Sequence, residues 1–221
     1  MHNIALNTQA IDQFKKLYRK KRGEISLRLG EFRQRGLQAG DDELFSELAF
    51  CLLTPQSRAK FCWEAIMNLK EQNMLLKGSA DQIKRRLHCV RFHNKKASYV
   101  VAARNIFLRN GAIAMKQLLK QHDDSYACRE WLVKNVKGLG YKEASHFLRN
   151  IGQGENMAIL DRHILKNLHL LGVIAKIPET LNKTTYRQIE TKMEKFALSV
   201  NIPFAHLDLL LWYKETGEIF K

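Results

Sequence analysis

The chain is short of the features that mark several protein classes. Only three of its 221 residues are proline, and its four cysteines form no C-x-x-C pair. No apolar run reaches the ~18 residues that a membrane span needs, and the N-terminus MHNIALNTQA lacks the apolar core of a secretory signal. Acidic residues are also scarce, because 22 Asp and Glu stand against 37 Lys and Arg. We therefore expect a soluble intracellular protein with reduced thiols and no disulfide or cysteine-held metal.

The excess of basic residues is the strongest compositional signal of function. A net charge of +15 destabilises a compact chain by self-repulsion unless a polyanion binds to it. Basic residues gather within Lys15–Arg22 and across Lys84–Arg86. Each run alone is typical of a solvated helix face, but the total charge favours the phosphate backbone of a nucleic acid as the partner.

Apolar residues recur at intervals of three and four along most of the chain, which is the period of an amphipathic helix. The pattern is clear at Leu44, Phe45, Leu48, Ala49 and Leu52. No stretch shows the convincing alternation of apolar and polar residues that marks a half-buried strand. The sequence therefore predicts an all-α fold of about ten helices joined by short loops.

Several helix starts carry local signals. Ser79 followed by Gln82 predicts a capping box, and Thr185 followed by Gln188 predicts a second one. Pro55 is expected to open a helix, because proline is favoured at the first helical position.

The segment Trp131–Leu148 carries the most informative pattern in the chain. One helix ends before the turn Gly138-Leu139-Gly140, and another begins at Tyr141. The glycines permit positive φ and let another backbone come close, and the amides at the start of the second helix can bind a phosphate. A G-x-G turn alone also fits an ordinary pair of capped helices. In so basic a protein, the pattern favours a clamp on the DNA backbone.

In this context the segment resembles the helix–hairpin–helix of the DNA base-excision glycosylases, which is followed by a Gly/Pro-rich loop and an aspartate. Here the loop is Gly152–Asn156, which has no proline, and the aspartate is Asp161. Other segments are similar to the type-2 8-oxoguanine DNA glycosylase/AP lyases, a group common in archaea. These segments are Leu53-Thr54-Pro55-Gln56-Ser57, Val90-Arg91-Phe92, Ile159-Leu160-Asp161-Arg162-His163 and the final Lys221.

The resemblance implies two helical lobes that flank a DNA cleft. Residues 42–152 would form a six-helix barrel that ends in the helix–hairpin–helix, and residues 1–41 with 153–221 would form the other lobe. Some relatives hold an iron–sulfur cluster with four cysteines near the C-terminus. No cysteine follows Cys128 here, so that cofactor is excluded.

The resemblance makes Lys142 the nucleophile and Asp161 its carboxylate partner. Cutting a base from deoxyribose develops positive charge at C1′, which a nearby carboxylate stabilises. An amine at C1′ can then form a Schiff base and drive strand cleavage by β-elimination. Taken singly, Lys142 also fits a phosphate contact, and Asp161 fits a helix N-cap. Their joint spacing after the G-x-G hairpin favours catalysis.

The resemblance also implies which residues contact the DNA backbone and which one fills the space that the flipped-out base leaves in the duplex. Gln56 would fill the space that the base leaves, although a surface glutamine in a turn is the alternative. Arg91 and Phe92 would support the distorted strand, although they fit a helix-terminal charge and a core phenylalanine equally well. Gly138 and Gly140 would bring backbone amides to a phosphate.

For the damaged base, the resemblance implies stacking by Trp212 and recognition by the C-terminal carboxylate of Lys221. An acceptor at this place selects the N7–H of 8-oxoguanine over the N7 acceptor of guanine. Asp208 lies four residues before Trp212 and so shares its helix face. Tyr99 is a further candidate for the base pocket, although a core tyrosine fits it as well.

Together these features predict a bifunctional DNA glycosylase/AP lyase that excises 8-oxoguanine and cleaves the strand by β-elimination. A glycosylase/lyase for oxidised pyrimidines would share Lys142, Asp161 and the hairpin. A non-catalytic helix–hairpin–helix module would share the hairpin alone. We expect double-stranded DNA with oxidised guanine as the partner, no cofactor or metal, no membrane, a monomeric state and a cytoplasmic, nucleoid-associated location.

Overall fold

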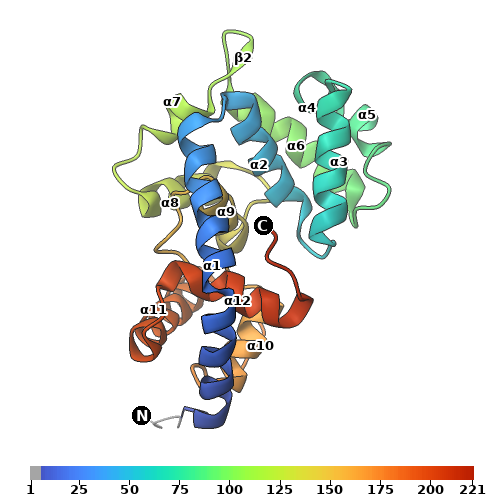
Figure 1. Ribbon diagram of the computed structural model, residues 1–221. Coiled ribbons are helices and arrows are strands. Elements are labelled where there is room, and N and C mark those ends of the chain that lie inside the picture. Colours follow the sequence, from blue (N-terminus) through green and yellow to red (C-terminus); the bar gives the residue numbers. More distant parts are fainter. Residues whose placement is uncertain (1–5) are drawn as a thin grey trace. The chain divides into compact units, whose positions relative to one another are not determined.

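The computed structural model describes residues 6–221, which form twelve helices and one short β-hairpin (Figure 1). The all-α prediction is confirmed. The helices are α1 Thr8–Gln38, α2 Asp41–Leu53, α3 Ala59–Glu71, α4 Met74–Lys77, α5 Ala80–Lys84, α6 His93–Phe107, α7 Met115–Leu119, α8 Ser125–Asn135, α9 Tyr141–Asn150, α10 Arg162–Leu170, α11 Lys183–Val200 and α12 Phe204–Thr216. The strands are β1 Leu108–Arg109 and β2 Ala112–Ile113.

The chain divides into two compact units. Unit 1 comprises the residues through Arg33 together with Gly154–Lys221, and unit 2 comprises Gln34–Gln153. This division places the first boundary after residue 33, whereas the prediction places it after residue 41. The difference arises because α1 runs for 31 residues without a break and continues from one unit into the other.

Unit 2 is built around α2. Every residue of Leu44–Leu53 is buried, because α2 packs against α3, α6, α7 and α9. A helix that is covered all round must be apolar on all its faces, and this stretch is apolar except at Ser46 and Glu47. The buried Glu47 carboxylate accepts a hydrogen bond from Asn150 and pairs with Arg35. The C-terminal end of α2 leads directly into the turn that contains Gln56.

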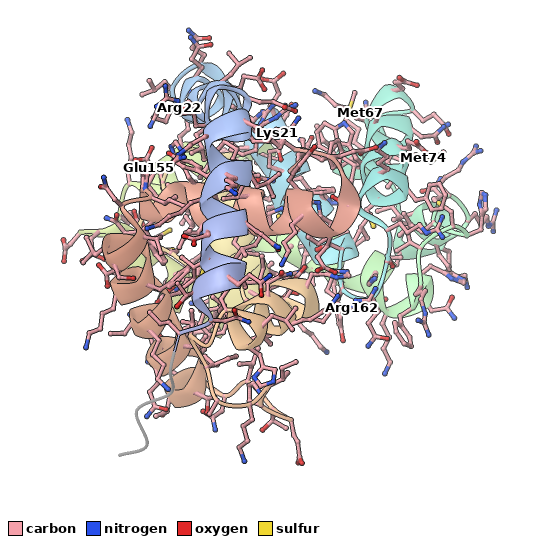
Figure 2. The ribbon with its side chains drawn as sticks, turned by 60° about the horizontal axis from the view of Figure 1, so that its bottom comes forward. Lys21, Arg22, Met67, Met74, Glu155 and Arg162 are labelled. Atoms are coloured by element: carbon pink, nitrogen blue, oxygen red, sulfur yellow. The ribbon has the colours of Figure 1, made fainter. Side chains whose placement is uncertain are left out.

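Unit 1 packs α12 against both α10 and α11. The part of α1 in this unit buries Ile11 and Phe14 near its start and Ile25, Leu29 and Phe32 further along, and Phe14 lies 6.3 Å from Phe196 between ring centroids. Two residues of the basic run of α1, Lys21 and Arg22, lie on different sides of the helix (Figure 2). The Lys21 ammonium lies 4.4 Å from the centre of the Tyr213 ring and 2.7 Å from the Glu24 carboxylate.

Local signals are correct at one cap and wrong at two other helix starts. Ser79 and Gln82 form the predicted capping box. Thr185 is not the N-cap, because Asn182 caps α11 and its side chain accepts a hydrogen bond from the Thr185 amide. Pro55 does not open a helix. It lies in a turn, and α3 begins at Ala59.

The β-hairpin is a small departure from the expected absence of strands, and it projects beyond the neighbouring helices of unit 2 (Figure 1). Asn110 and Gly111 both have positive φ, at 49° and 81°. Two such residues make the type I′ turn that closes a tight hairpin.

In the described part of the chain, no single helix is long and apolar enough to cross a membrane. The pair α11 and α12 passes the same test of length and composition together, but it is bent by 94°.

Candidate functional site

The turn between α8 and α9 is shaped by its two glycines. Gly138 has a φ of +89°, and any side chain there would collide with the ring of Tyr99 on α6. The Nζ of Lys137, the residue before Gly138, lies 5.9 Å from the centre of the same Tyr99 ring. The Gly140 amide donates to the Glu143 carboxylate at 3.2 Å, which satisfies one N–H at the start of α9. Tyr99 therefore packs on the hairpin turn.

A buried arginine joins the two helices of the hairpin. Arg129 is fully buried on α8 and donates to the Ser145 hydroxyl on α9 at 3.0 Å. Its guanidinium lies 5.3 Å from the ring centre of Tyr126 and 5.5 Å from that of Tyr141. A planar cation that stacks on two rings and bonds a third group fixes the helices more firmly than a lysine could. The helix that carries Lys142 is therefore rigidly placed within unit 2.

Lys142 is the second residue of α9 and stands directly after the glycine turn. Its side chain is 21% exposed, so the amine is sheltered but accessible. Its Nζ lies 3.4 Å from one oxygen of Glu143, while the other oxygen of Glu143 accepts the Gly140 amide. The nucleophile candidate and the turn are thus tied to the same carboxylate.

The residues after α2 form a strained β-turn that presents Gln56. The Ser57 amide donates to the Thr54 carbonyl at 3.0 Å, and Pro55 occupies the second position of the turn. Gln56 is exposed and has a φ of 56°, the left-handed conformation that glycine or asparagine usually supplies at this point. For a residue with a Cβ, this conformation costs about 1–2 kcal/mol. The surrounding contacts must therefore hold the turn.

Those contacts centre on Lys96 of α6. Its Nζ donates to the Leu53 carbonyl at 2.7 Å, to the Pro55 carbonyl at 2.6 Å and to the Ser57 hydroxyl at 3.1 Å. The Ser57 hydroxyl also accepts the Arg91 amide at 3.0 Å. The segments that carry Gln56 and Arg91 are therefore joined through one serine and one ammonium.

Burial shifts the ionisation of two groups beside this turn. It is the main cause that lowers the pKa of Lys96 to about 8, and the nearby charge of Lys142 lowers it as well. Burial also raises the pKa of the Cys62 thiol to about 11. The thiol is therefore protonated at neutral pH and donates to the Leu53 carbonyl at 3.2 Å.

In unit 1, Asp161 is the N-cap of α10. One of its oxygens, Oδ1, accepts the amides of His163 and Ile164, each at 2.8 Å. The side chain is half-buried. Within the part of the chain that the structure describes, both bonds fall on Oδ1, so capping leaves the other oxygen, Oδ2, available to a ligand.

The start of α10 is linked to Trp212 on α12 through His163. The His163 ring meets the Trp212 ring edge-on, with centroids 5.4 Å apart and planes at 84°. Glu215 accepts from Lys166 at 3.0 Å and from Asn167 at 2.9 Å, and its carboxylate lies 3.5 Å from the His163 ring. The hydrogen bond from Asn167, with that from Lys166, lowers the pKa of Glu215. Unit 1 thus places Asp161 at the start of α10 and Trp212 on α12, and hydrogen bonds from Lys166 and Asn167 to Glu215 join these two helices.

The other two candidates in unit 1 are buried. Asp208 is 7% exposed on α12, one turn before Trp212. Lys221, the last residue, is 8% exposed, and Ile219 beside it is equally buried. The C-terminal residues are therefore docked rather than extended into solvent.

The remaining candidates all belong to unit 2, and the structure distributes them over two places. Tyr99, Gly138 and Gly140 meet at the hairpin, whereas Gln56 and Arg91 lie on the two segments joined by Ser57. Lys142 belongs to unit 2, whereas Asp161 belongs to unit 1.

Sequence reasoning missed Lys96, although a signal for it exists. Lys96, Val100, Ala103 and Phe107 follow a helical spacing, and all four are buried. A lysine on an otherwise apolar stripe indicates a charged group that the core must satisfy. His163 and Glu215 were also missed, and only the spacing of Glu215 three residues after Trp212 could have indicated a shared face.

Among residues 6–221, no three His, Cys, Asp or Glu side chains gather as ligands for a metal ion.

Comparison with known proteins gives consistent matches. The family model described as 8-oxoguanine DNA glycosylase matches residues 25–202. A relative from Fusobacterium nucleatum, named 8-oxoguanine DNA glycosylase/AP lyase, is 45% identical over 210 residues, which cover 95% of this chain and 97% of the relative. A protein of the same name from Methanocaldococcus jannaschii is 36% identical over 201 residues, covering 89% of this chain and 91% of that protein.

Solved structures match over nearly the whole chain. The Methanocaldococcus jannaschii 8-oxoguanine glycosylase/lyase, in complex with a 15mer DNA containing 8-oxoguanine, superposes with a TM-score of 0.87 at 32% identity. The match covers 97% of this chain and 100% of that one. The 8-oxoguanine DNA glycosylase of Thermotoga maritima superposes with a TM-score of 0.81 at 30% identity, covering 96% and 99% of the two chains.

Proposed function

Because the chain belongs to the 8-oxoguanine DNA glycosylase family, we propose that it removes 8-oxoguanine from double-stranded DNA and then cleaves the strand at the abasic site. The observation that carries this proposal is the place of Lys142, a partly sheltered amine at the start of α9, directly after the glycine turn of the hairpin. A lysine there supplies the amine that a lyase reaction requires.

In the proposed reaction, the Lys142 amine attacks C1′ of the damaged nucleotide, and the bond from C1′ to the base nitrogen breaks. The base leaves with the bonding electron pair and takes up a proton. The sugar ring then opens to give a Schiff base between Lys142 and C1′. Loss of a proton from C2′ expels the 3′ phosphate by β-elimination.

Asp161 is proposed to stabilise the positive charge that develops at C1′ as the base leaves. This role of Asp161 is supported by its Oδ2 oxygen, which capping leaves available, because Oδ1 already accepts hydrogen bonds from two backbone amides. Capping fixes the carboxylate in a single orientation, which is what a preorganised electrostatic group requires.

For the damaged base, we propose stacking on Trp212, recognition of N7–H by the C-terminal carboxylate of Lys221, and further contacts from Asp208 and Tyr99. The docking of Ile219 beside Lys221 supports a fixed position for that carboxylate. His163 supports Trp212 through its edge-to-face ring contact, and Glu215 lies 3.5 Å from the His163 ring.

For the DNA itself, we propose that the turn of Gly138 and Gly140 binds a phosphate of the backbone. Gln56 would occupy the space of the flipped base, and Arg91 would contact the distorted strand. Their exposure and the net charge of +15 support this assignment. We also propose that the protein acts as a monomer on nucleoid DNA in the cytoplasm, with a barrel lobe of residues 42–152 and a second lobe of residues 1–41 and 153–221.

Borohydride trapping tests the proposed function. Duplexes that each carry one lesion are incubated with the protein and borohydride, which reduces a Schiff base to a stable adduct. We expect an adduct with 8-oxoguanine DNA that is lost in Lys142→Gln. Adducts with oxidised pyrimidines alone would replace the proposed substrate. DNA binding without an adduct on any lesion would indicate a non-catalytic module.

A further inference from the structure

The ammonium group of Lys96 is buried, and no carboxylate of residues 6–221 forms an ion pair or hydrogen bond with it. Lys96 is only 4% exposed, and its three hydrogen-bond partners are two backbone carbonyls and one hydroxyl. A buried charge is unfavourable unless its surroundings satisfy it fully. Here three oxygens at 2.6–3.1 Å use all three N–H donors of the ammonium.

All three oxygens belong to one short stretch of chain, which includes the turn of Gln56. The Leu53 carbonyl ends α2, the Pro55 carbonyl precedes Gln56, and the Ser57 hydroxyl follows it. Lys96 therefore forms hydrogen bonds to the turn on both sides of Gln56. A turn with a left-handed glutamine needs such a constraint, because the conformation is unfavourable by itself.

The same network reaches a second exposed segment. Ser57 accepts the amide of Arg91, and the next residue, Phe92, is also left-handed, with a φ of 58° and 54% of its surface exposed. Phe92 is followed by α6, which carries Lys96 itself. One ammonium and one serine hydroxyl thus connect the two exposed, strained segments of Gln56 and Phe92.

We propose that Lys96 is a positioning residue for the DNA-distorting step, which holds the turns of Gln56 and of Arg91 and Phe92 ready before DNA arrives. The inference rests on the proposed function of Gln56 as the residue that fills the space of the flipped base. Preorganised turns avoid the loss of conformational entropy that would otherwise oppose binding. Lys96 itself does not touch the reacting atoms.

The test separates extrusion of the base from chemistry at the sugar. Single-turnover rates are measured on a duplex with 8-oxoguanine and on a duplex with a preformed abasic site, where no base has to be extruded. The variants are Lys96→Met, which keeps the length of the side chain but removes its charge and donors, and Ser57→Ala, which keeps the charge of Lys96. Lys95→Met is the matched control, because Lys95 is the exposed neighbour of Lys96 and this substitution removes the same positive charge.

We expect Lys96→Met to slow the excision of 8-oxoguanine about tenfold or more, since small misplacements of positioning groups have effects of this size. Cleavage of the abasic site should stay within about twofold of wild type. Ser57→Ala should show the same selective loss at smaller amplitude, and Lys95→Met should cut both substrates like wild type.

A spectroscopic readout follows extrusion directly. With 2-aminopurine beside the lesion and Lys142→Gln as the background, DNA remains uncut and fluorescence reports unstacking. Adding Lys96→Met should lower the amplitude of the fluorescence rise.

Equal loss on both substrates would overturn the inference, because Lys96 would then act through Lys142 or through the fold. Unchanged rates in both variants would also overturn it. If Lys96→Met does not fold, as judged by thermal unfolding, Ser57→Ala decides by its selective loss or its absence. A wild-type protein inactive on both substrates would instead refute the proposed function.

Discussion

Replacing Gly138 with alanine perturbs the hairpin at the point where the structure allows no side chain. The φ of +89° costs a residue with a Cβ about 1–2 kcal/mol. The added methyl would also overlap the ring of Tyr99, and forcing a group into a packed contact costs about 1–3 kcal/mol. We therefore expect Gly138→Ala to lower the free energy of unfolding by about 2–5 kcal/mol.

Gly111 provides a matched control for this substitution. It has a similar φ of +81°, but a Cβ there would meet nothing within 4 Å. Gly111→Ala should therefore lose only the conformational part, about 1–2 kcal/mol. Truncating the ring with Tyr99→Ala should recover the steric part in a double-mutant cycle with Gly138→Ala.

The assay is urea unfolding followed by circular dichroism, combined with binding of an undamaged duplex at two salt concentrations. Gly138→Ala should weaken duplex binding, because a displaced turn brings its amides less well to a phosphate, whereas Gly111→Ala should bind like wild type. Equal destabilisation by the two substitutions, with no coupling to Tyr99→Ala, would refute the packing of the tyrosine ring on the hairpin turn.

Three other predictions concern the site. Asp161→Asn should retain stability within about 0.5 kcal/mol, because asparagine caps a helix as well as aspartate does, but it should slow base removal while DNA binding persists; unchanged turnover would remove Asp161 from the reaction. Extending the chain beyond Lys221 should impair the selection of 8-oxoguanine more than the cleavage of a preformed abasic site, and equal effects would exclude the C-terminal carboxylate as the reader. Since burial lowers the pKa of Lys96 from 10.5 to about 8, the unfolded chain binds this proton more tightly, so the contribution of Lys96 to stability rises between about pH 8 and pH 10.5. The difference in free energy of unfolding between wild type and Lys96→Met should shift in favour of wild type across this range in urea titrations, and a constant difference would contradict the buried ammonium.

Much of the fold could be predicted because its signals are local. The helical period of α2 and the glycines of the hairpin need only a few neighbouring residues, as does the capping box at Ser79. The prediction of Thr185 as the cap of α11 was wrong, because the helix starts earlier and is capped by Asn182, three residues before Thr185.

The turn of Gln56 shows where local signals fail. A proline is equally suited to the first position of a helix and to the second position of a β-turn. What decides in favour of the turn is Lys96, about 40 residues later in the chain, which binds the carbonyls on both sides of Gln56. No sequence window of ordinary length contains both partners.

The candidate site was predictable mainly through resemblance, because single residues such as Lys142 and Asp161 also fit ordinary structural roles. The structure adds the partners that resemblance did not supply. These are Glu143 beside Lys142, His163 beside Trp212 with Glu215 next to His163, and the ring of Tyr99 against Gly138.

The most direct test of the account is to locate the trapped amine. After borohydride reduction with 8-oxoguanine DNA, the adduct is digested with protease and nuclease, and mass spectrometry identifies the modified lysine. We expect the sugar remnant on Lys142. A remnant on Lys96, whose pKa burial lowers to about 8, would contradict both the assignment of the nucleophile and the positioning role of Lys96.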